Sequence, residues 1–241
     1  MLVLAIDTSN RALTVALASD QQLLGEITLN IKQTHSEGLM PAITYLFQAA
    51  KLKPAAIDRV AVAQGPGSYT GIRIAVTTAK TLAWTLNKEL VGVSSLAVIA
   101  SNVLSTQRLI VPVFDARRQA VFTGAYQWQQ GHLVSVLSDR HIKLAAWLPE
   151  LLATKQPLTF VGQTAVFSDT IRKMCGKQAK IAPEAANLPR GQQLAWLGQQ
   201  AQPIANVHGF VPTYLRKTEA EATWLKNHPN NEGHEPYVEE I

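Results

Sequence analysis

The sequence AVAQGPGSYTGIR, residues 61–73, decides the expected fold of this 241-residue chain. An apolar run at residues 57–63 enters a loop that carries Gly65, Pro66 and Gly67, and a helix is expected from Ser68 onward. A glycine-rich turn between a strand and a helix directs backbone N–H groups and the helix N-terminus at an anion. The stretch therefore predicts an α/β fold with a loop built like a phosphate-binding loop.

The spacing of this loop departs from both well-known phosphate-binding motifs. A P-loop places Lys and then Ser or Thr after its last glycine, whereas Ile72 and Arg73 follow Gly71 here. The dinucleotide motif Gly-x-Gly-x-x-Gly is one residue shorter than the spacing of Gly65, Gly67 and Gly71. We therefore expect at most weak binding of phosphate, ATP or ADP, with these candidate residues: Asp7, Thr8, Ser9, Gly65, Gly67 and Ser68.

The pattern around the loop predicts the element order βββαβαβα for the first part of the chain. A Thr-x-x-Glu capping box at Thr34 and Glu37 predicts a helix that runs to about residue 50. Ser94 and Ser95 are expected to cap a further helix that ends near residue 104. The remaining elements are strands at 2–6, 12–18, 22–29, 57–63 and 90–93, and a helix at 68–86.

A weak internal repeat begins near residue 106. An apolar strand at 109–114 ends in Asp115, and a shift of 108 residues places Asp7 on Asp115 and the strand at 12–18 on one at 120–126. The pattern then diverges, with expected helices at 144–153, 164–175 and 191–201 and a short strand at 158–161. We predict an N-terminal domain at 1–105, a C-terminal domain at 106–221 and a flexible acidic tail at 222–241.

Composition indicates a folded globular protein, with 47% hydrophobic and 16% charged residues. No apolar run reaches the roughly 18 residues of a membrane span, and the N-terminus lacks the basic region and cleavage site of a signal peptide. A single cysteine, Cys175, excludes a disulfide framework and a cysteine-based zinc site. We expect a cytoplasmic protein without membrane association.

Charge is uneven along the chain. Residues 106–218 carry 13 Lys and Arg against 5 Asp and Glu, whereas residues 219–241 carry 1 against 6. A basic region of this kind is compatible with direct RNA binding. Its charges are scattered and few aromatics lie among them, so a solvated basic surface is the other interpretation.

Two copies of an α/β unit led by a three-strand meander suggest the actin/sugar-kinase/Hsp70 (ASKHA) architecture, with the second half diverged. Over residues 1–221 the chain resembles the TsaB (YeaZ) family in the order and spacing of six segments: IDTSNRALTVAL, THSEGLMPAI, GPGSYTGIR, VSSLAVIA, VFDARRQAVFTGAY and PTYLRKTEAE. The resemblance implies a partner, the catalytic subunit TsaD, and cooperation with the ATPase TsaE. Together these proteins place threonylcarbamoyl on the adenosine beside the anticodon of ANN-decoding tRNAs.

The resemblance also implies that this chain is a non-catalytic dimerisation subunit without a cofactor, which meets tRNA only indirectly. In TsaD, a His-x-x-x-His pair binds the metal, and the matching positions here are Ser95 and Ile99. Neither side chain can replace an imidazole as a metal ligand. We therefore expect no metal site, no catalytic residue and no metallopeptidase activity. The alternative function is that of a small-molecule phosphotransferase that uses Asp7 and the glycine loop.

The first two helices are the expected partner surface. No charged residue lies between Arg73 and Lys80, so the second helix is apolar or small nearly all round, as in helices buried on both sides. TsaB proteins pair with TsaD through these helices, and an isolated chain is able to form a homodimer through the same face. The residues expected there are Leu39, Met40, Ile43, Phe47, Ile72, Ala75, Val76 and Ala79.

Overall fold

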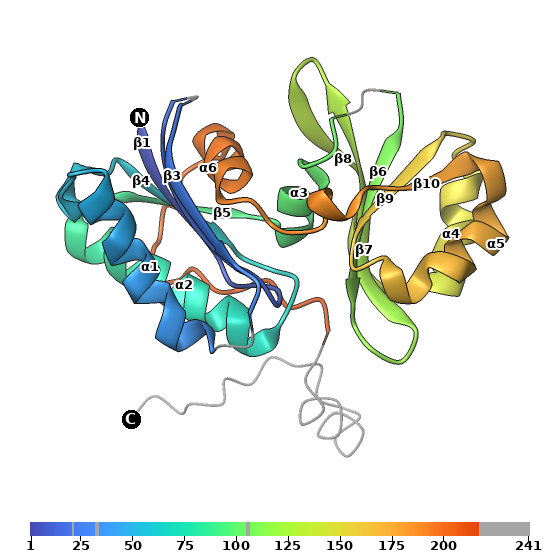
Figure 1. Ribbon diagram of the computed structural model, residues 1–241, viewed down its shortest axis with the longest axis horizontal. Helices are drawn as coiled ribbons and strands as arrows, with labels where there is room; N and C mark the ends of the chain where they lie inside the picture. Colours follow the sequence, from blue (N-terminus) through green and yellow to red (C-terminus); the bar gives the residue numbers. More distant parts are fainter. Residues whose placement is uncertain (21, 32–33, 105–106, 217–241) are drawn as a thin grey trace.

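The computed structural model contains two five-stranded sheets with the same strand order (Figure 1). It describes residues 1–20, 22–31, 34–104 and 107–216. The tail predicted at 222–241 lies outside the described residues. Within the described ranges, no helix has the length and apolar character needed to cross a membrane.

The first sheet has the order β3-β2-β1-β4-β5. Its first three strands form an antiparallel meander, and β4 and β5 continue parallel to β1. Strands β1, β2 and β4 are buried along almost their whole length, because helices cover both faces of the sheet. The strands are β1 (Leu2–Asp7), β2 (Leu13–Ser19), β3 (Gln22–Leu29), β4 (Arg59–Ala63) and β5 (Glu89–Val93).

The second sheet repeats this topology in the order β10-β9-β6-β7-β8. An antiparallel meander again comes first, and two parallel strands again follow on the other side of the opening strand. The predicted ASKHA-type duplication is thereby confirmed. The strands are β6 (Leu109–Asp115), β7 (Ala120–Gln129), β8 (His132–Lys143), β9 (Leu158–Gly162) and β10 (Ala179–Ile181).

Helices α1 (His35–Ala49) and α2 (Tyr69–Leu86) pack on one face of the first sheet. The strands alternate, so that Leu4 and Ile6 join the core beneath these helices while Val3 and Ala5 face the other side. In the second unit, α4 (Leu144–Ala153) and α5 (Ser168–Cys175) take the same place, with Trp147 fully buried between helix and sheet.

The last helix of each unit packs on the sheet of the other unit. Helix α3 (Ser95–Ala100) contacts β6 and β7, and α6 (Gly191–Gln200) contacts β1, β2 and β4. Arg59 anchors the end of α6, since its buried guanidinium donates to the carbonyls of residues 198, 199 and 201 and pairs with Glu89 at 2.7 Å. Helices α3 and α6 thus each pack across the predicted division at residue 105.

Beyond α6 the chain returns along α2 as an extended segment, residues 204–216, which we call the strap (Figure 1). The amide of Thr213 donates to the carbonyl of Gln64 at 2.8 Å. Lys80 on α2 donates through Nζ to the carbonyls of His208 and Phe210, each at 2.8 Å. The strap thus covers one flank of α2.

The predicted elements differ from the structure in several places, one of which is α3, which ends at Ala100 rather than near residue 104. Strands β8 and β10 had no predicted counterpart, and the helix expected at 164–175 starts as α5 only at residue 168. Thr34 is the N-cap of α1 through its carbonyl, which accepts from the amides of Glu37 and Gly38. The prediction of a capping box is wrong, because the Thr34 side chain makes no capping hydrogen bond.

Candidate functional site

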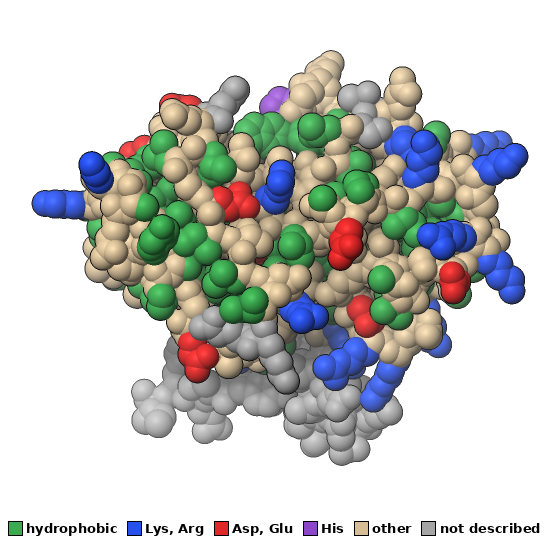
Figure 2. Space-filling model, in the orientation of Figure 1, with side chains coloured by type: hydrophobic (Ala, Val, Ile, Leu, Met, Phe, Trp, Pro, Cys, Tyr) green, Lys and Arg blue, Asp and Glu red, His purple; other side chains and the backbone are tan. Residues whose placement is uncertain are grey.

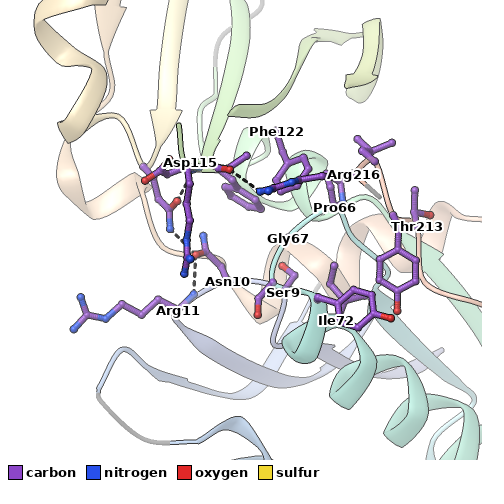
Figure 3. Close-up of a pocket in the computed structure, with 18 of the residues that line it drawn as sticks. Ser9, Asn10, Arg11, Pro66, Gly67, Ile72, Asp115, Phe122, Thr213 and Arg216 are labelled. Atoms are coloured by element: carbon purple, nitrogen blue, oxygen red, sulfur yellow. Dashed lines mark hydrogen bonds between the residues drawn. The ribbon is translucent and has the colours of Figure 1, made fainter. Parts of the chain in front are cut away.

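A cleft of about 650 Å³ opens where the two units face each other (Figure 3). Four segments line it: the turn after β1, the loop before α2, the turn between β6 and β7, and the end of the strap. Of the candidate phosphate-binding residues, Ser9, Gly67 and Ser68 line the cleft. Asp7, Thr8 and Gly65 are buried behind them.

The glycine loop packs directly on the turn that follows β1. A Cβ on Gly67 would lie 2.1 Å from the carbonyl oxygen of Ser9, and one on Gly71 would lie 2.1 Å from that of Thr8. Thr8 Oγ1 donates to the Gly71 carbonyl at 2.7 Å, and the amide of Ser68 donates to the Ser9 carbonyl at 2.7 Å. The close approach of two backbones therefore accounts for both glycines.

Several loop amides already have acceptors within the protein. The Gly65 amide donates to Ser95 Oγ at 3.1 Å, and Ser68 Oγ accepts from the Gly71 amide at 3.3 Å as the cap of α2. A phosphate cradle needs such amides directed at the ligand. This geometry counts against the phosphotransferase interpretation.

Asp7 lies beneath the cleft and is 1% exposed. Its Oδ1 accepts from the amide of Ser9 at 2.7 Å, so this carboxylate stabilises the turn after β1. Burial raises the pKa of this carboxyl above its ordinary value, and the hydrogen bond from the Ser9 amide acts in the opposite direction. Asp7 Oδ2 and Ser9 Oγ are buried without a hydrogen-bond partner in the described structure.

Gln163 joins the two units across the cleft. Its Nε2 donates to Asn10 Oδ1 at 2.7 Å, and its Oε1 accepts from the amide of Asp115 at 2.7 Å. Asp115 Oδ1 in turn accepts from the amide of Arg117 at 2.8 Å. His35, at the rim, contacts the carbonyl of Asn10 through Nε2 at 2.8 Å. The bond from Gln163 to Asn10 ties the two walls of the cleft together, and the other bonds lie within one unit.

The positions that match the metal ligands of TsaD are buried in the protein. Ser95 is fully buried and bonds to the loop, and Ile99 packs into the core between α3 and the second sheet. Among the described residues, no group of three or more His, Cys, Asp and Glu side chains is placed to hold a metal ion.

The structure corrects the side chains expected at the partner surface. Met40 is 46% exposed, but the other seven belong to the core beneath α1 and α2 and are at most 5% exposed: Leu39, Ile43, Phe47, Ile72, Ala75, Val76 and Ala79. Their spacing follows a single helical face. These side chains stabilise the monomer and are not available to a partner.

The outward faces of α1 and α2 carry few charged side chains. The two cations in the middle of α2 turn to the strap: Lys80 bonds to its carbonyls, and Arg73 donates to Tyr214 at 2.8 Å. Arg73 also lies over the Tyr69 ring, 4.1 Å from its centroid. Apart from Arg73, the exposed residues of the two helices are Ser36, Glu37, Met40, Pro41, Thr44, Tyr45, Gln48 and Ala49 on α1 and Tyr69, Thr70, Thr77, Thr81, Trp84 and Thr85 on α2.

The cleft also contains residues that the sequence did not assign to it. Arg11, Arg117, Arg118 and Arg216 line it from both units. The adjacent pair Arg117-Arg118 after Asp115 is the sequence feature that could have indicated two of them. Figure 2 shows Lys and Arg side chains gathered over the second unit, in line with its basic composition.

We expect ADP to bind the isolated chain only weakly, with a dissociation constant in the high micromolar to millimolar range, about −4 to −6 kcal/mol. The reason is that the loop lacks the P-loop lysine and uses its amides internally. Isothermal titration calorimetry checks this value. A sub-micromolar constant would contradict it and restore the phosphotransferase interpretation.

Comparison with protein families finds a match over residues 22–224 to the family model "TsaD: tRNA N6-adenosine threonylcarbamoyltransferase". The chain is 42% identical to a tRNA threonylcarbamoyladenosine biosynthesis protein TsaB from Bacillus subtilis, over 94% of this chain and 99% of that protein. It is 28% identical to the TsaB of Haemophilus influenzae, over 93% and 96% of the two chains.

A solved structure, YeaZ from Pseudomonas aeruginosa, superposes with a TM-score of 0.73 at 26% identity. The match covers 89% of this chain and 99% of that one. The similarity therefore extends over both units and includes the elements that line the cleft and the outward face of α1 and α2.

Proposed function

The chain belongs to the TsaB family of tRNA threonylcarbamoyladenosine biosynthesis proteins, and from this premise we propose that it is a non-catalytic subunit that pairs with TsaD. The paired proteins modify the adenosine next to the anticodon of ANN-decoding tRNAs. The role of this chain is to hold the catalytic subunit in its working arrangement, with TsaE joining through the complex and tRNA bound mainly by the partners.

The observation that supports this proposal is the low number of charged side chains on the outward face of α1 and α2. Protein interfaces are depleted of charge at their centre and depend on a few fully desolvated contacts. On α2 the strap engages both Arg73 and Lys80, which leaves the threonines at 70, 77 and 81 outward. Side chains of this size let a partner helix approach closely. The same face serves a homodimer when the chain is alone.

The proposal is tested by co-expressing the chain with TsaD from the same cell. We expect the two to co-purify and the mixture, with TsaE and ATP, to modify tRNA, while neither protein does so alone. Modification at an undiminished rate without this chain would contradict the scaffold role. Turnover of ATP by the isolated chain with a small acceptor would instead support the phosphotransferase alternative.

A further inference from the structure

Exposed cations lie at the end of the second unit that α4, α5 and β10 form (Figure 1). We call these five residues the basic end: Lys155, Arg172, Lys173, Lys177 and Lys180. Residues 144–181 carry two carboxylates, Glu150 and Asp169, and Glu150 pairs with Arg140 of β8 at 2.9 Å. In Figure 2, Lys and Arg side chains gather at this end of the molecule. That leaves Asp169 as the nearby carboxylate to offset the basic end.

Contacts between separate segments bring these cations together. Gln178 Nε2, in the 3-10 helix η3 (Gly176–Gln178), donates to the carbonyl of Gln156 in the turn after α4 at 2.8 Å. This turn carries Lys155, and η3 carries Lys177. Strand β10 pairs parallel to β9, and α5 packs against both β10 and α4. The basic end is therefore assembled by the fold from four segments of the chain.

The cations of the basic end have no ion pair with a described residue. A helix dipole favours cations in the last turn, and this accounts for Arg172 and Lys173 at the end of α5. Lys155 and Lys180 lie outside α5, where the dipole has little effect. Folding therefore does not explain why cations occupy these positions.

The backbone at Lys155 supports the same conclusion. Lys155 follows the C-cap of α4 with a φ of 57°, and its amide donates to the carbonyl of Leu152 at 3.0 Å. Glycine or asparagine is the usual residue at this position of a helix end, so the backbone does not call for a lysine. An added Cβ on Gly176, between α5 and η3, would meet nothing within 4 Å. The surface there is open to a large partner.

We propose that the basic end binds the phosphate backbone of RNA, as a second contact to the tRNA that the complex with TsaD modifies. The inference rests on the proposed function, which brings tRNA to the complex. Each cation that neutralises a phosphate releases a counterion from the RNA, so several cations on one surface add to the affinity. The contact is weak by itself, in keeping with a tRNA that the partners bind mainly.

The arrangement suits a polyanion better than a small anion. None of the five cations lines the cleft, and all are exposed, whereas small ligands are bound in concave pockets. Residues 168–181 contain no aromatic side chain on which a base could stack. Contacts to phosphates carry no sequence information. The basic end therefore recognises the RNA backbone and not the anticodon.

The test is a fluorescence-anisotropy titration of a labelled tRNA with an ANN anticodon by the isolated full-length chain, at salt concentrations from about 50 to 200 mM. Binding should weaken steeply with salt, and a tRNA with another anticodon should bind within about threefold. Lys177→Gln with Lys180→Gln should weaken binding about tenfold at the lowest salt. The same variant should lower the slope of log affinity against log salt by about 2.

The matched control is Lys51→Gln with Lys53→Gln, which removes two exposed cations from the first unit and should bind like wild type. Lys177→Arg with Lys180→Arg keeps the charges of the basic end and should also bind like wild type. The proposal is overturned if tRNA does not bind at the lowest salt, if the glutamine variant of the basic end binds unchanged, or if the control loses as much. Tighter binding of polyglutamate than of tRNA would assign the surface to an acidic protein and overturn it too.

A failure of this proposal is distinguishable from a failure of the proposed function. The Lys177→Gln, Lys180→Gln chain should co-purify with TsaD, and in the reconstituted assay it should raise the KM for tRNA rather than lower kcat. An unchanged KM, or loss of co-purification, would overturn the RNA contact. If the wild-type chain does not pair with TsaD, the proposed function fails, whereas the titration of the isolated chain still measures its own affinity for RNA.

Discussion

Thr77→Arg is expected to abolish pairing with TsaD and tRNA modification together while the monomer stays folded. Thr77 is exposed on α2, opposite the buried face formed by residues such as Ala75 and Ala79. An arginine there would enter the proposed interface without a partner, and an unpaired buried charge costs about 3 kcal/mol or more. That corresponds to roughly a 100-fold weaker complex. Co-purification and the reconstituted modification assay measure the two losses.

Two further variants make this result interpretable. Ala146→Arg places the same charge on an exposed position of α4, so it should pair and modify like wild type. Ala75→Arg should instead unfold the chain, because Ala75 is fully buried on the side of α2 that packs on the first sheet. Wild-type pairing by a folded Thr77→Arg protein, checked by circular dichroism, would place the partner surface elsewhere.

Gly67→Ala is expected to lower the free energy of unfolding by about 3 kcal/mol or more. The added methyl group would lie 2.1 Å from the backbone oxygen of Ser9, so the loop or the turn after β1 must move. For a chain of this size, the change corresponds to a fall of roughly 6–12 °C in Tm. Thermal unfolding followed by circular dichroism measures it.

Gly209→Ala is the control for the glycine prediction. Its new methyl group would meet only the side chain of Asn206, at 2.9 Å from Nδ2, and that flexible end is able to move away. We expect a Tm close to that of wild type. Equal Tm values for the two alanine variants would show that the loop tolerates a side chain at residue 67 and that its glycines have another purpose.

The sequence predicted much of the fold because local patterns specify most of its elements. The duplication was predicted from two apolar strands that end at Asp7 and Asp115, 108 residues apart. In the structure these strands are β1 and β6, which hold the same position in the two sheets. Strand β8 was missed because its residues are mostly exposed, so they lack a clear apolar face. The exchange of α3 and α6 depends on contacts far apart in sequence, which no local pattern contains.

The side chains expected at the partner face lie on the buried side of α2, and the reason for this is identifiable. The threonines of α2 carry no charge, so the helix was interpreted as apolar all round. Spacing alone separates the sides: Ile72, Ala75, Val76, Ala79 and Ala83 form one stripe, and these are the residues that the structure buries. The packing of the strap along α2 was not predictable from the sequence. It depends on bonds from Arg73 and Lys80 to residues 208–214, and no sequence pattern indicates those bonds.

The reciprocal packing of α3 and α6 has a consequence for how the protein is made. On the ribosome, the first sheet emerges complete once residue 93 is out, yet the face that holds Val3, Ala5 and Ala61 is covered only after residue 200 has been synthesised. During that interval a growing chain presents an uncovered apolar sheet face, which is the kind of surface that chaperones bind. If the gene were divided between the two repeats, the first product would lack α6 and the second would lack α3. Each product would then keep an uncovered apolar sheet face permanently.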